Sequence, residues 1–231
     1  MSKRNKKGRD INGVVLLDKA SGGSSNHFLQ QVKRLFDASK AGHTGSLDPL
    51  ASGLLPICFG QGTKVAQFLL NDDKRYSVRA KLGQISNTGD SEGKVINFGP
   101  TQGIDENYIR NILTNFIGNI NQVPPMYSAL KRNGTPLYKL ARKGIEIERS
   151  PRPVIIHEIN FLGFDDKVVS LDIFCSKGTY IRTLVEDIGK SLGCGGHVVE
   201  LRRTGFAHLD LSGSKTYEQL SKLKEQNLES L

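Results

Sequence analysis

The chain has 231 residues, of which 37% are hydrophobic and 24% charged, a composition typical of a globular protein. No apolar run approaches the ~20 residues needed to span a bilayer, and no signal-peptide stretch follows the basic start, so we expect a cytoplasmic location. The 32 Lys and Arg against 23 Asp and Glu give a formal net charge of +9, which favours nucleic acid as a partner, ahead of an anionic membrane surface or plain solubility.

The first part of the chain predicts a basic arm followed by alternating strand and helix. Residues 1–9 carry five Lys or Arg, which predicts a disordered arm, either an inert tail or a weak tether for RNA phosphates. The apolar run 13–17 predicts a buried strand. Cap-type residues at 24–26 precede helical apolar spacing over 29–36. Segment 41–53 is dense in Gly, Ser and Pro and predicts a loop.

The next elements follow from apolar patterning alone. Residues 54–59 predict a second buried strand, and 63–70 predict a short helix. Residues 76–82 alternate between apolar and polar side chains, as a half-buried strand does. Asp105 is a suitable N-cap for a helix with its apolar face over 109–116.

Segment 124–153 differs from its surroundings, because prolines bound it and little apolar periodicity lies between them. Basic and aromatic residues alternate there, an arrangement that suits phosphate contacts and base stacking in RNA. We expect an inserted, partly exposed segment, and a solvated helix-loop face is the alternative. The residues concerned are Tyr127, Lys131, Arg132, Tyr138, Lys139, Arg142, Lys143 and Arg149.

The C-terminal part predicts one more strand and two helices. Residues 169–175 alternate as a strand, and 181–192 follow helical spacing. A polar helix is predicted from Thr216. Because strands and helices are mixed without regular βαβ alternation, the pattern predicts an α+β fold with a largely antiparallel sheet.

The cysteines predict neither a disulfide framework nor a metal centre. There are three, widely spaced, and an odd number does not suit a set of disulfides. Cys194 and His197 form a lone C-x-x-H pair, whereas a structural zinc site takes about four ligands. We expect a protein without metal or cofactor.

Asp48 is the leading candidate for chemistry. It lies between Gly45-Ser46 and Pro49 in the predicted loop, where glycine allows close backbone approach and proline stiffens the turn. A carboxylate presented in this way is placed to react. From the residues alone, however, an Asp-Pro pair in a loop is more often only a turn.

Four collinear blocks of sequence resemble the TruB-type tRNA pseudouridine synthases. The first is AGHTGSLDPLASGLLPICFGQGTKVAQFLL, which starts at Ala41, and the second is DKRYSVRAKLG over 73–83. The third is PPMYSALKRNGTPLYKLARKGIEIERSPRPV over 124–154. The fourth is CSKGTYIRTLVEDIGKSLGCGGHVVELRRTGF over 175–206. GHTGSLDPLASG and SKGTYIRTL are highly specific to the family.

The resemblance implies both fold and reaction. The fold is the pseudouridine synthase fold, a mixed and largely antiparallel sheet with a central active-site cleft. The reaction isomerises the T-loop uridine at position 55 of tRNA after base flipping, by breaking its glycosidic bond and rejoining the base through C5. No cofactor or metal takes part. By match to GSLDPLASG, Asp48 is the essential carboxylate.

The resemblance also assigns roles around Asp48. Arg182 is expected to pair with Asp48 and hold it ionised, and Tyr76 to stack on the extruded uracil. His43 is placed beside the space that the flipped nucleotide leaves. The remaining expected substrate-binding residues are Tyr180, Leu201, Lys19 and Lys64, with Lys131, Arg132, Arg142 and Lys143 of segment 124–153. For Lys19 and Lys64 a solvated charge is the alternative.

The resemblance predicts a catalytic domain over 10–231 that acts as a monomer on tRNA without an obligate protein partner. Bacterial members usually continue into a PUA-type RNA-binding domain, which we expect to be absent here. Three other activities stay open. They are a T-arm-binding tRNA-folding chaperone, a base-releasing glycosylase, and an RNA-guided enzyme of the dyskerin-like branch.

Overall fold

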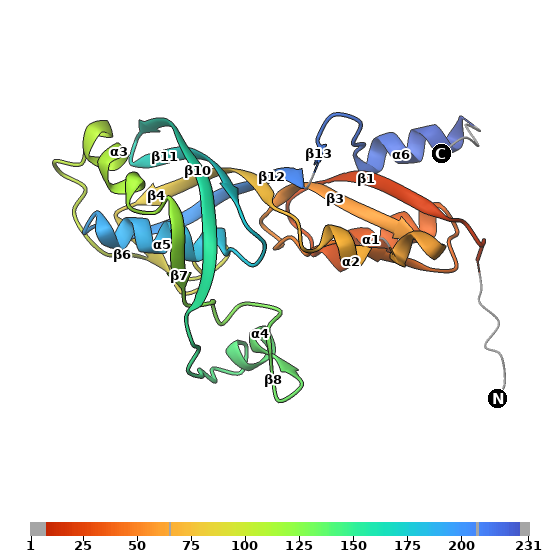
Figure 1. The fold of residues 1–231 in the computed structure, drawn as a ribbon, viewed down its shortest axis with the longest axis horizontal. Coiled ribbons are helices and arrows are strands. Elements are labelled where there is room, and N and C mark those ends of the chain that lie inside the picture. The colour runs from red at the N-terminus through yellow and green to blue at the C-terminus, as the bar shows by residue number, and fades with distance from the viewer. Residues whose placement is uncertain (1–7, 65, 207, 227–231) are drawn as a thin grey trace. The chain divides into compact units, whose positions relative to one another are not determined.

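The computed structural model describes residues 8–64, 66–206 and 208–226, apart from the side chains of residues 67 and 68 (Figure 1). Most of the predicted basic arm, residues 1–7, lies outside the described part. The chain forms two compact units, one of residues 1–76 with 202–231 and one of residues 77–201. Within the described residues, no helix has the length and apolar content needed to cross a membrane.

The first unit is built on strand β3, which covers Ser52–Phe59 and is buried over nearly its whole length. Strands β1 (Gly13–Lys19) and β2 (Ala41–His43) both pair with β3 in antiparallel register, and the end of β12 (Gly196–Phe206) pairs with it in parallel. The other elements of this unit are α1 (Ser25–Leu35), the 3₁₀ helix η1 (Gly60–Lys64), α2 (Ala66–Leu69), β13 (Leu209–Asp210) and α6 (Tyr217–Glu225).

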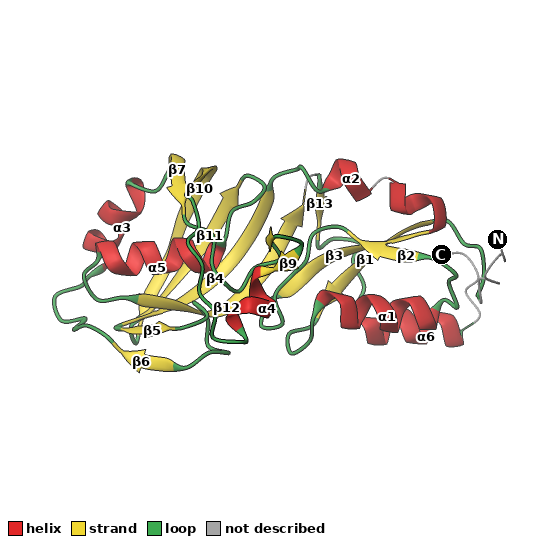
Figure 2. Ribbon diagram, turned by 90° about the horizontal axis from the view of Figure 1, so that it is seen from below, coloured by secondary structure: helices red, strands yellow, loops and turns green. Residues whose placement is uncertain are grey.

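Capping residues start the two longer helices of this unit. The Ser24 side chain accepts a hydrogen bond from the His27 N–H at the start of α1. Thr216 and Gln219 form a reciprocal capping box at the start of α6. Both helices lie against the same face of β1 and β3 (Figure 2). Leu29 and Val32 are the buried apolar residues of α1.

The second unit is a sheet in the order β12–β4–β11–β10–β7, with antiparallel pairing of β10 to both β11 and β7. Its strands are β4 (Lys74–Leu82), β5 (Gln84–Ser86), β6 (Val95–Asn97), β7 (Gly118–Gln122), β10 (Arg152–Asp165) and β11 (Val168–Cys175). Its principal helices are α3 (Glu106–Thr114) and α5 (Ile181–Ser191). Strands β4 and β12 each contribute residues to both units.

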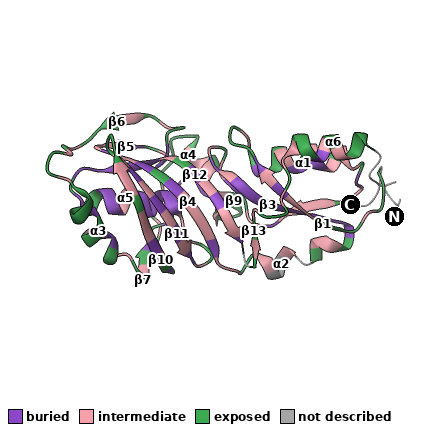
Figure 3. Cartoon of the chain, turned by 90° about the horizontal axis from the view of Figure 1, so that it is seen from above, coloured by how far each residue is buried: buried purple, intermediate pink, exposed green. Residues whose placement is uncertain are grey.

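The core of the second unit lies between β11 and α5. The alternation predicted for β11 is confirmed, because Val169, Leu171, Ile173 and Cys175 are each at most 2% exposed. Leu184, Val185 and Ile188 of α5 are buried as well. Figure 3 shows buried residues along these strands and the helix, with exposed residues on the connections and over much of α3. The predicted N-cap at Asp105 is also confirmed.

Segment 124–153 projects from the end of β7 (Figure 1). It contains a two-stranded hairpin of β8 (Lys131–Arg132) and β9 (Thr135–Pro136), followed by the short helix α4 (Leu137–Ala141). Strand β10 begins before the predicted end of the segment, at Arg152.

Two sequence predictions were wrong in detail. Residues 41–53 are not a continuous loop, because Ala41–His43 forms β2 and the stretch from Ser52 belongs to β3. The backbone of β3 offers hydrogen-bond partners along its length, so residues 41–43 pair with it although they belong to a Gly-rich segment. The predicted helix over 63–70 is divided between η1 and α2.

Candidate active site

Asp48 lies in the turn that connects β2 with β3, inside the first unit. Its own carbonyl accepts a hydrogen bond of 3.1 Å from the Ala51 N–H, which closes the turn across Pro49. The side chain of Asp48 is half-buried, and Pro49 is exposed. The turn therefore holds a carboxylate at a fixed position on the edge of the core.

Lys19 fixes one side of this turn. Its side chain is completely buried, and its Nζ donates to the carbonyl oxygens of Ala51 at 2.5 Å, Ala20 at 2.9 Å and Pro49 at 3.4 Å. An ammonium group has three protons to donate, and a buried one needs partners of this kind. The alternative of a solvated charge is therefore wrong for Lys19. Lys64 is exposed, and its role stays a prediction.

Ser25 anchors the residue immediately before Asp48. The Ser25 Oγ accepts a hydrogen bond of 2.7 Å from the Leu47 N–H and donates one of 3.0 Å to the Leu47 carbonyl. Both side chains are buried, Ser25 at 2% and Leu47 at 6% exposure. Both backbone groups of Leu47 are thus tied to the start of α1.

Arg203 fixes the other end of the turn, and sequence reasoning missed it. It is 1% exposed, and its guanidinium donates to the carbonyls of Leu54 at 2.8 Å and Gly45 at 3.1 Å. Within the described residues, its remaining hydrogen-bond partner is Tyr76 rather than a carboxylate. Burial lowers the pKa of Arg203, while the charge and hydrogen bond of Tyr76 oppose that shift.

Strand alternation and close packing explain why Arg203 is the buried member of the Arg202-Arg203 pair. Neighbouring strand residues point to opposite faces, and Arg202 instead bonds Asp18 at 2.6 Å near the surface. Arg203 pairs with Gly53, where φ is +101° and an added Cβ would lie 2.2 Å from the Arg203 carbonyl oxygen. Only glycine allows this approach.

His43 and Tyr76 lie near the same cation. Burial lowers the pKa of His43, and the positive charge of Arg203 lowers it further, so the imidazole is neutral at physiological pH. The Nδ1 of His43 is buried without a hydrogen-bond partner in the described part of the chain. Tyr76 is half-buried and oriented by its hydrogen bond with Arg203.

Arg182 is the corresponding fixed group of the second unit, in the first turn of α5 as the sequence predicted. It is 4% exposed and donates to the carbonyls of Thr88 at 2.7 Å and Tyr127 at 2.8 Å. Asp90, also buried, lies 3.7 Å from Arg182 and accepts hydrogen bonds from the Thr88 hydroxyl and the Glu92 N–H. The expected pairing of Arg182 with Asp48, which belongs to the other unit, stays a prediction.

Tyr180 is held by a residue that the sequence did not single out. Its N–H donates to the Gln122 Oε1 at 3.0 Å, and the Gln122 Nε2 donates to its carbonyl at 3.2 Å. Gln122 is 1% exposed, so this bidentate contact fixes the start of α5 against the end of β7. Leu201 is 7% exposed on β12, inside the second unit.

The described residues thus provide a carboxylate on a fixed turn in one unit and a buried guanidinium on a fixed helix end in the other. Such preorganised charges suit acid–base or nucleophilic chemistry. Within the same residues, no group of three or more His, Cys, Asp or Glu is placed to hold a metal ion. In the sequence, Asp90, Gln122 and Arg203 each have polar neighbours, so no local signal could have singled them out.

Comparison with protein families gives two adjoining matches. Residues 33–181 match the family model described as TruB family pseudouridylate synthase, N-terminal domain. Residues 182–231 match the model described as tRNA pseudouridylate synthase B C-terminal domain.

Curated relatives agree with these matches. A tRNA pseudouridine synthase B of Shewanella sp. (strain ANA-3) is 55% identical over 220 residues, covering 95% of this chain and 69% of that protein. A protein of the same name from Actinobacillus pleuropneumoniae serotype 5b (strain L20) is 53% identical over 232 residues, covering 100% of this chain and 76% of its own length.

Solved structures share the fold. A Cbf5-Nop10-Gar1 complex contains a chain that is 29% identical with a TM-score of 0.73, covering 95% of this chain. A chain of the archaeal box H/ACA sRNP Nop10-Cbf5 complex is 26% identical with a TM-score of 0.70, covering 98% of this chain. This chain spans 57% and 62% of those two chains.

Replacing Arg203 with Met should destabilise the first unit by about 1–3 kcal/mol, because two buried carbonyls lose their donor. Chemical denaturation measures the loss, and hydrogen exchange should rise at residues 44–51. The matched control is Arg202→Met, which removes a partly exposed ion pair and should cost about 1 kcal/mol or less. Equal losses in the two variants, with unchanged exchange at 44–51, would show that Arg203 does not hold the turn.

Proposed function

The chain belongs to the TruB family of pseudouridylate synthases, and we propose that it converts the uridine at position 55 in the T-loop of tRNA to pseudouridine. The curated relatives are named tRNA pseudouridine synthase B, which supports tRNA as the substrate. The observation that carries the proposal is the Asp48 turn, whose backbone is fixed by Lys19, Ser25 and Arg203. Burying these three polar side chains costs desolvation free energy, and the fixed turn that results presents a carboxylate for chemistry.

The reaction is an isomerisation and needs no co-reactant. The bond between C1′ and N1 breaks, the uracil turns, C1′ bonds to C5, and the proton lost from C5 is balanced by one gained at N1. One group must start the cleavage and a base must remove the C5 proton. A carboxylate is able to do either, as a nucleophile or as a base. We assign this role to Asp48.

Arg182 is the proposed partner of Asp48. A guanidinium stabilises the ionised carboxylate and sets its orientation through paired hydrogen bonds. The bonds of Arg182 to two backbone carbonyls, with Asp90 beside it, support this role because they fix the guanidinium in advance. Asp90 then acts as a positioning residue behind Arg182.

The target base must leave its stack to reach a carboxylate, which requires a surface to receive it. We assign that surface to Tyr76, whose orientation the bond to Arg203 supports, with Tyr180 and Leu201 as further lining. We propose that the imidazole of His43, which is neutral at physiological pH, occupies the space that the flipped base leaves in the RNA loop. Lys64 is a proposed phosphate contact, because its side chain is exposed.

We propose that segment 124–153 binds the phosphate backbone of the RNA. Lys131, Arg132, Arg142 and Lys143 are all exposed on the β8–β9 hairpin and around α4. The guanidinium of Arg142 lies 5.5 Å from the ring centroid of Tyr138. Exposed cations beside an aromatic ring suit phosphate contact and base stacking.

The same basic segment supports a second function, a T-arm-binding tRNA-folding chaperone. Asp48 distinguishes the two functions, because a protein that only binds RNA would not need a carboxylate there. A base-releasing glycosylase would instead form free uracil. We further propose that the enzyme acts in the cytoplasm as a monomer, without a metal, cofactor or obligate protein partner.

Replacing Asp48 with Asn should abolish pseudouridine formation in a T-arm stem-loop, because the swap keeps shape but removes charge and basicity. Pseudouridine mapping measures the product, and binding of the same RNA should be retained. The control is Asp10→Asn, an exposed acid whose loss should leave turnover unchanged. Turnover above background in the Asp48 variant would remove Asp48 from the mechanism, and free uracil from the unaltered enzyme would indicate a glycosylase.

Replacing Arg182 with Lys should lower kcat by about 100-fold although the charge is kept, because an ammonium cannot reproduce the paired contacts and small misplacements are costly. Single-turnover kinetics at saturating RNA measures the effect. Arg79→Lys is the matched control, since Arg79 forms an exposed ion pair with Glu200. Near-normal turnover of the Arg182 variant would argue against its role at the carboxylate.

Replacing Lys131, Arg132, Arg142 and Lys143 together with Ala should weaken RNA binding and flatten its salt dependence. Each lost phosphate contact reduces the slope of log K against log salt by about 0.7–0.9, so the total change should approach about 3. A control that removes four exposed charges elsewhere combines Arg34, Lys40, Lys222 and Lys224→Ala. Equal slopes in the two variants would make segment 124–153 an ordinary solvated surface.

A further inference from the structure

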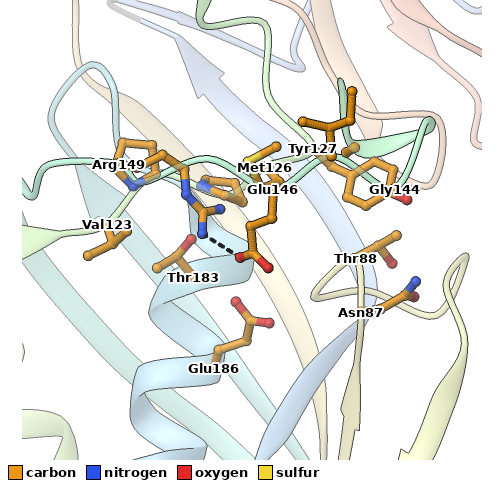
Figure 4. A pocket seen from close by; sticks show the side chains of 14 residues that line it. Asn87, Thr88, Val123, Met126, Tyr127, Gly144, Glu146, Arg149, Thr183 and Glu186 are labelled. Carbon is orange, nitrogen blue, oxygen red and sulfur yellow. Dashed lines mark hydrogen bonds and ion pairs between the residues drawn. The ribbon is translucent and has the colours of Figure 1, made fainter. Parts of the chain in front are cut away.

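Two pockets of similar volume lie within the described part of the second unit. One, of about 470 Å³, is lined by Thr88 and Tyr127, whose carbonyls bind Arg182, so it belongs with that residue (Figure 4). The other, of about 450 Å³, lies beside the β5–β6 hairpin at one end of the unit (Figure 2). The end of β4, the start of β5, residues 97–101 and the turn between β10 and β11 form its walls. None of the residues assigned above lines this β5–β6 pocket.

Phe98 is the aromatic residue of the β5–β6 pocket, and it is 60% exposed. Part of its ring lies against the backbone of Gly195, where an added Cβ would be 2.9 Å from the nearest ring atom. Its main chain is fixed, because the Phe98 N–H donates to the Gly83 carbonyl at 2.9 Å and the Gly83 N–H donates to the Gly195 carbonyl at 3.2 Å. The ring is therefore supported from one side and open on the other.

Glycine allows the stretch that carries Phe98 to lie directly on the turn after α5. At Gly99 an added Cβ would be 2.9 Å from the Cα of Cys194, and Gly195 has a φ of +75° that other residues rarely adopt. Backbone lies against backbone here, so the position of the ring is set before a ligand arrives. Preorganisation of this kind lowers the entropy cost of binding.

The turn between β10 and β11 brings a lysine to the same pocket. Asp166 and Lys167 have φ values of +44° and +64°, a conformation that is costly for residues other than glycine. Hydrogen bonds hold this turn to β4, from the Leu82 N–H to the Lys167 carbonyl at 2.8 Å and from the Lys81 Nζ to the Asp166 carbonyl at 2.5 Å. The Asp166 carboxylate pairs with Lys81 at 3.1 Å, and the Lys167 side chain is exposed. The charged residues of the lining, Lys81 and Lys167 against Asp166, therefore leave one net positive charge.

An amide pair adds hydrogen-bonding groups to the lining. The Gln84 Nε2 donates to the Asn97 Oδ1 at 3.0 Å. This bond does not use the Gln84 Oε1, an acceptor, or the Asn97 Nδ2, a donor. The pocket thus combines an open aromatic ring, a net positive charge and both kinds of hydrogen-bonding group.

We infer that the β5–β6 pocket binds one unpaired nucleotide of RNA, with its base stacked on Phe98 and its phosphate at Lys167. Proteins that bind single-stranded RNA combine aromatic rings with nearby cations in this way. The volume lies within the range of about 300–1,000 Å³ that is usual for small-molecule sites. The inference rests on the proposed function only for the identity of the RNA.

The polar lining favours a nucleotide over a protein partner, because the centre of a protein interface is usually depleted of charged residues. Six of the eleven lining residues are polar or charged. They are Lys81, Gln84, Asn97, Thr101, Asp166 and Lys167.

Replacing Phe98 with Leu should raise the Kd for a whole tRNA transcript by about 5-fold or more, because Leu keeps the apolar packing on Gly195 but has no ring face for stacking. The dependence of log K on log salt should not change, because stacking carries no charge. Phe98→Tyr should restore the affinity. The matched control is Tyr108→Leu, which removes a 41% exposed aromatic side chain of α3 outside the pocket and should leave the Kd unchanged.

Replacing Lys167 with Gln should reduce the slope of log K against log salt by about 0.7, the value for one phosphate contact on a single strand. Lys190→Gln, at an exposed lysine of α5 outside the pocket, should leave the slope unchanged. The same titrations with an isolated T-arm stem-loop identify the source of the nucleotide. A loss with both RNAs assigns it to the T-arm, and a loss with whole tRNA alone assigns it to another part of the tRNA.

Other outcomes overturn the inference. They are an unchanged Kd for Phe98→Leu with both RNAs, a loss that Phe98→Tyr does not restore, and an unchanged salt slope for Lys167→Gln. If the unaltered protein forms no pseudouridine but Phe98→Leu still weakens binding, the proposed function fails and the pocket assignment stands. Normal pseudouridine formation with unchanged binding in both variants would give the reverse conclusion.

Discussion

Two buried cations bonded to backbone carbonyls fix the Asp48 turn, and the candidate chemistry depends on them. Lys19 bonds the carbonyls of Pro49 and Ala51 on one side of the turn, and Arg203 bonds that of Gly45 on the other. Desolvating a cation is costly, and these carbonyl dipoles offset much of the cost. These hydrogen bonds act on backbone carbonyls, so they fix the main chain of the turn that carries Asp48.

In the second unit, Arg182 is likewise a buried cation that is bonded to backbone carbonyls. Two carbonyls and the Asp90 carboxylate surround the guanidinium, and Gln122 fixes the start of α5 through both backbone groups of Tyr180. An arginine restrained in this way loses little entropy when it meets a carboxylate, which is the advantage of preorganisation in catalysis. Glu186 lies one turn further along α5, and its raised pKa reflects burial within the same acidic surroundings.

The exposed cations of segment 124–153 are suited to contact RNA phosphates, as the proposed function requires. Contacts of this kind depend on salt and carry no sequence information. In the proposed function, the choice of a single uridine must therefore come from hydrogen bonds and packing rather than from these charges.

The sequence by itself predicted several of the elements and the family, and it singled out Asp48 as the candidate carboxylate. Alternation predicted β11, helical spacing predicted α1, α3 and α5, and the segment GHTGSLDPLASG drew attention to Asp48. Sequence patterns report local periodicity, so they could not show that residues 41–43 join a sheet. Nor could they choose between Arg202 and Arg203, whose burial depends on contact with Gly45, 158 positions away. Lys19, Asp90 and Gln122 acquire their roles in the same way, because a buried polar side chain is defined by the distant backbone groups that the tertiary structure brings to it.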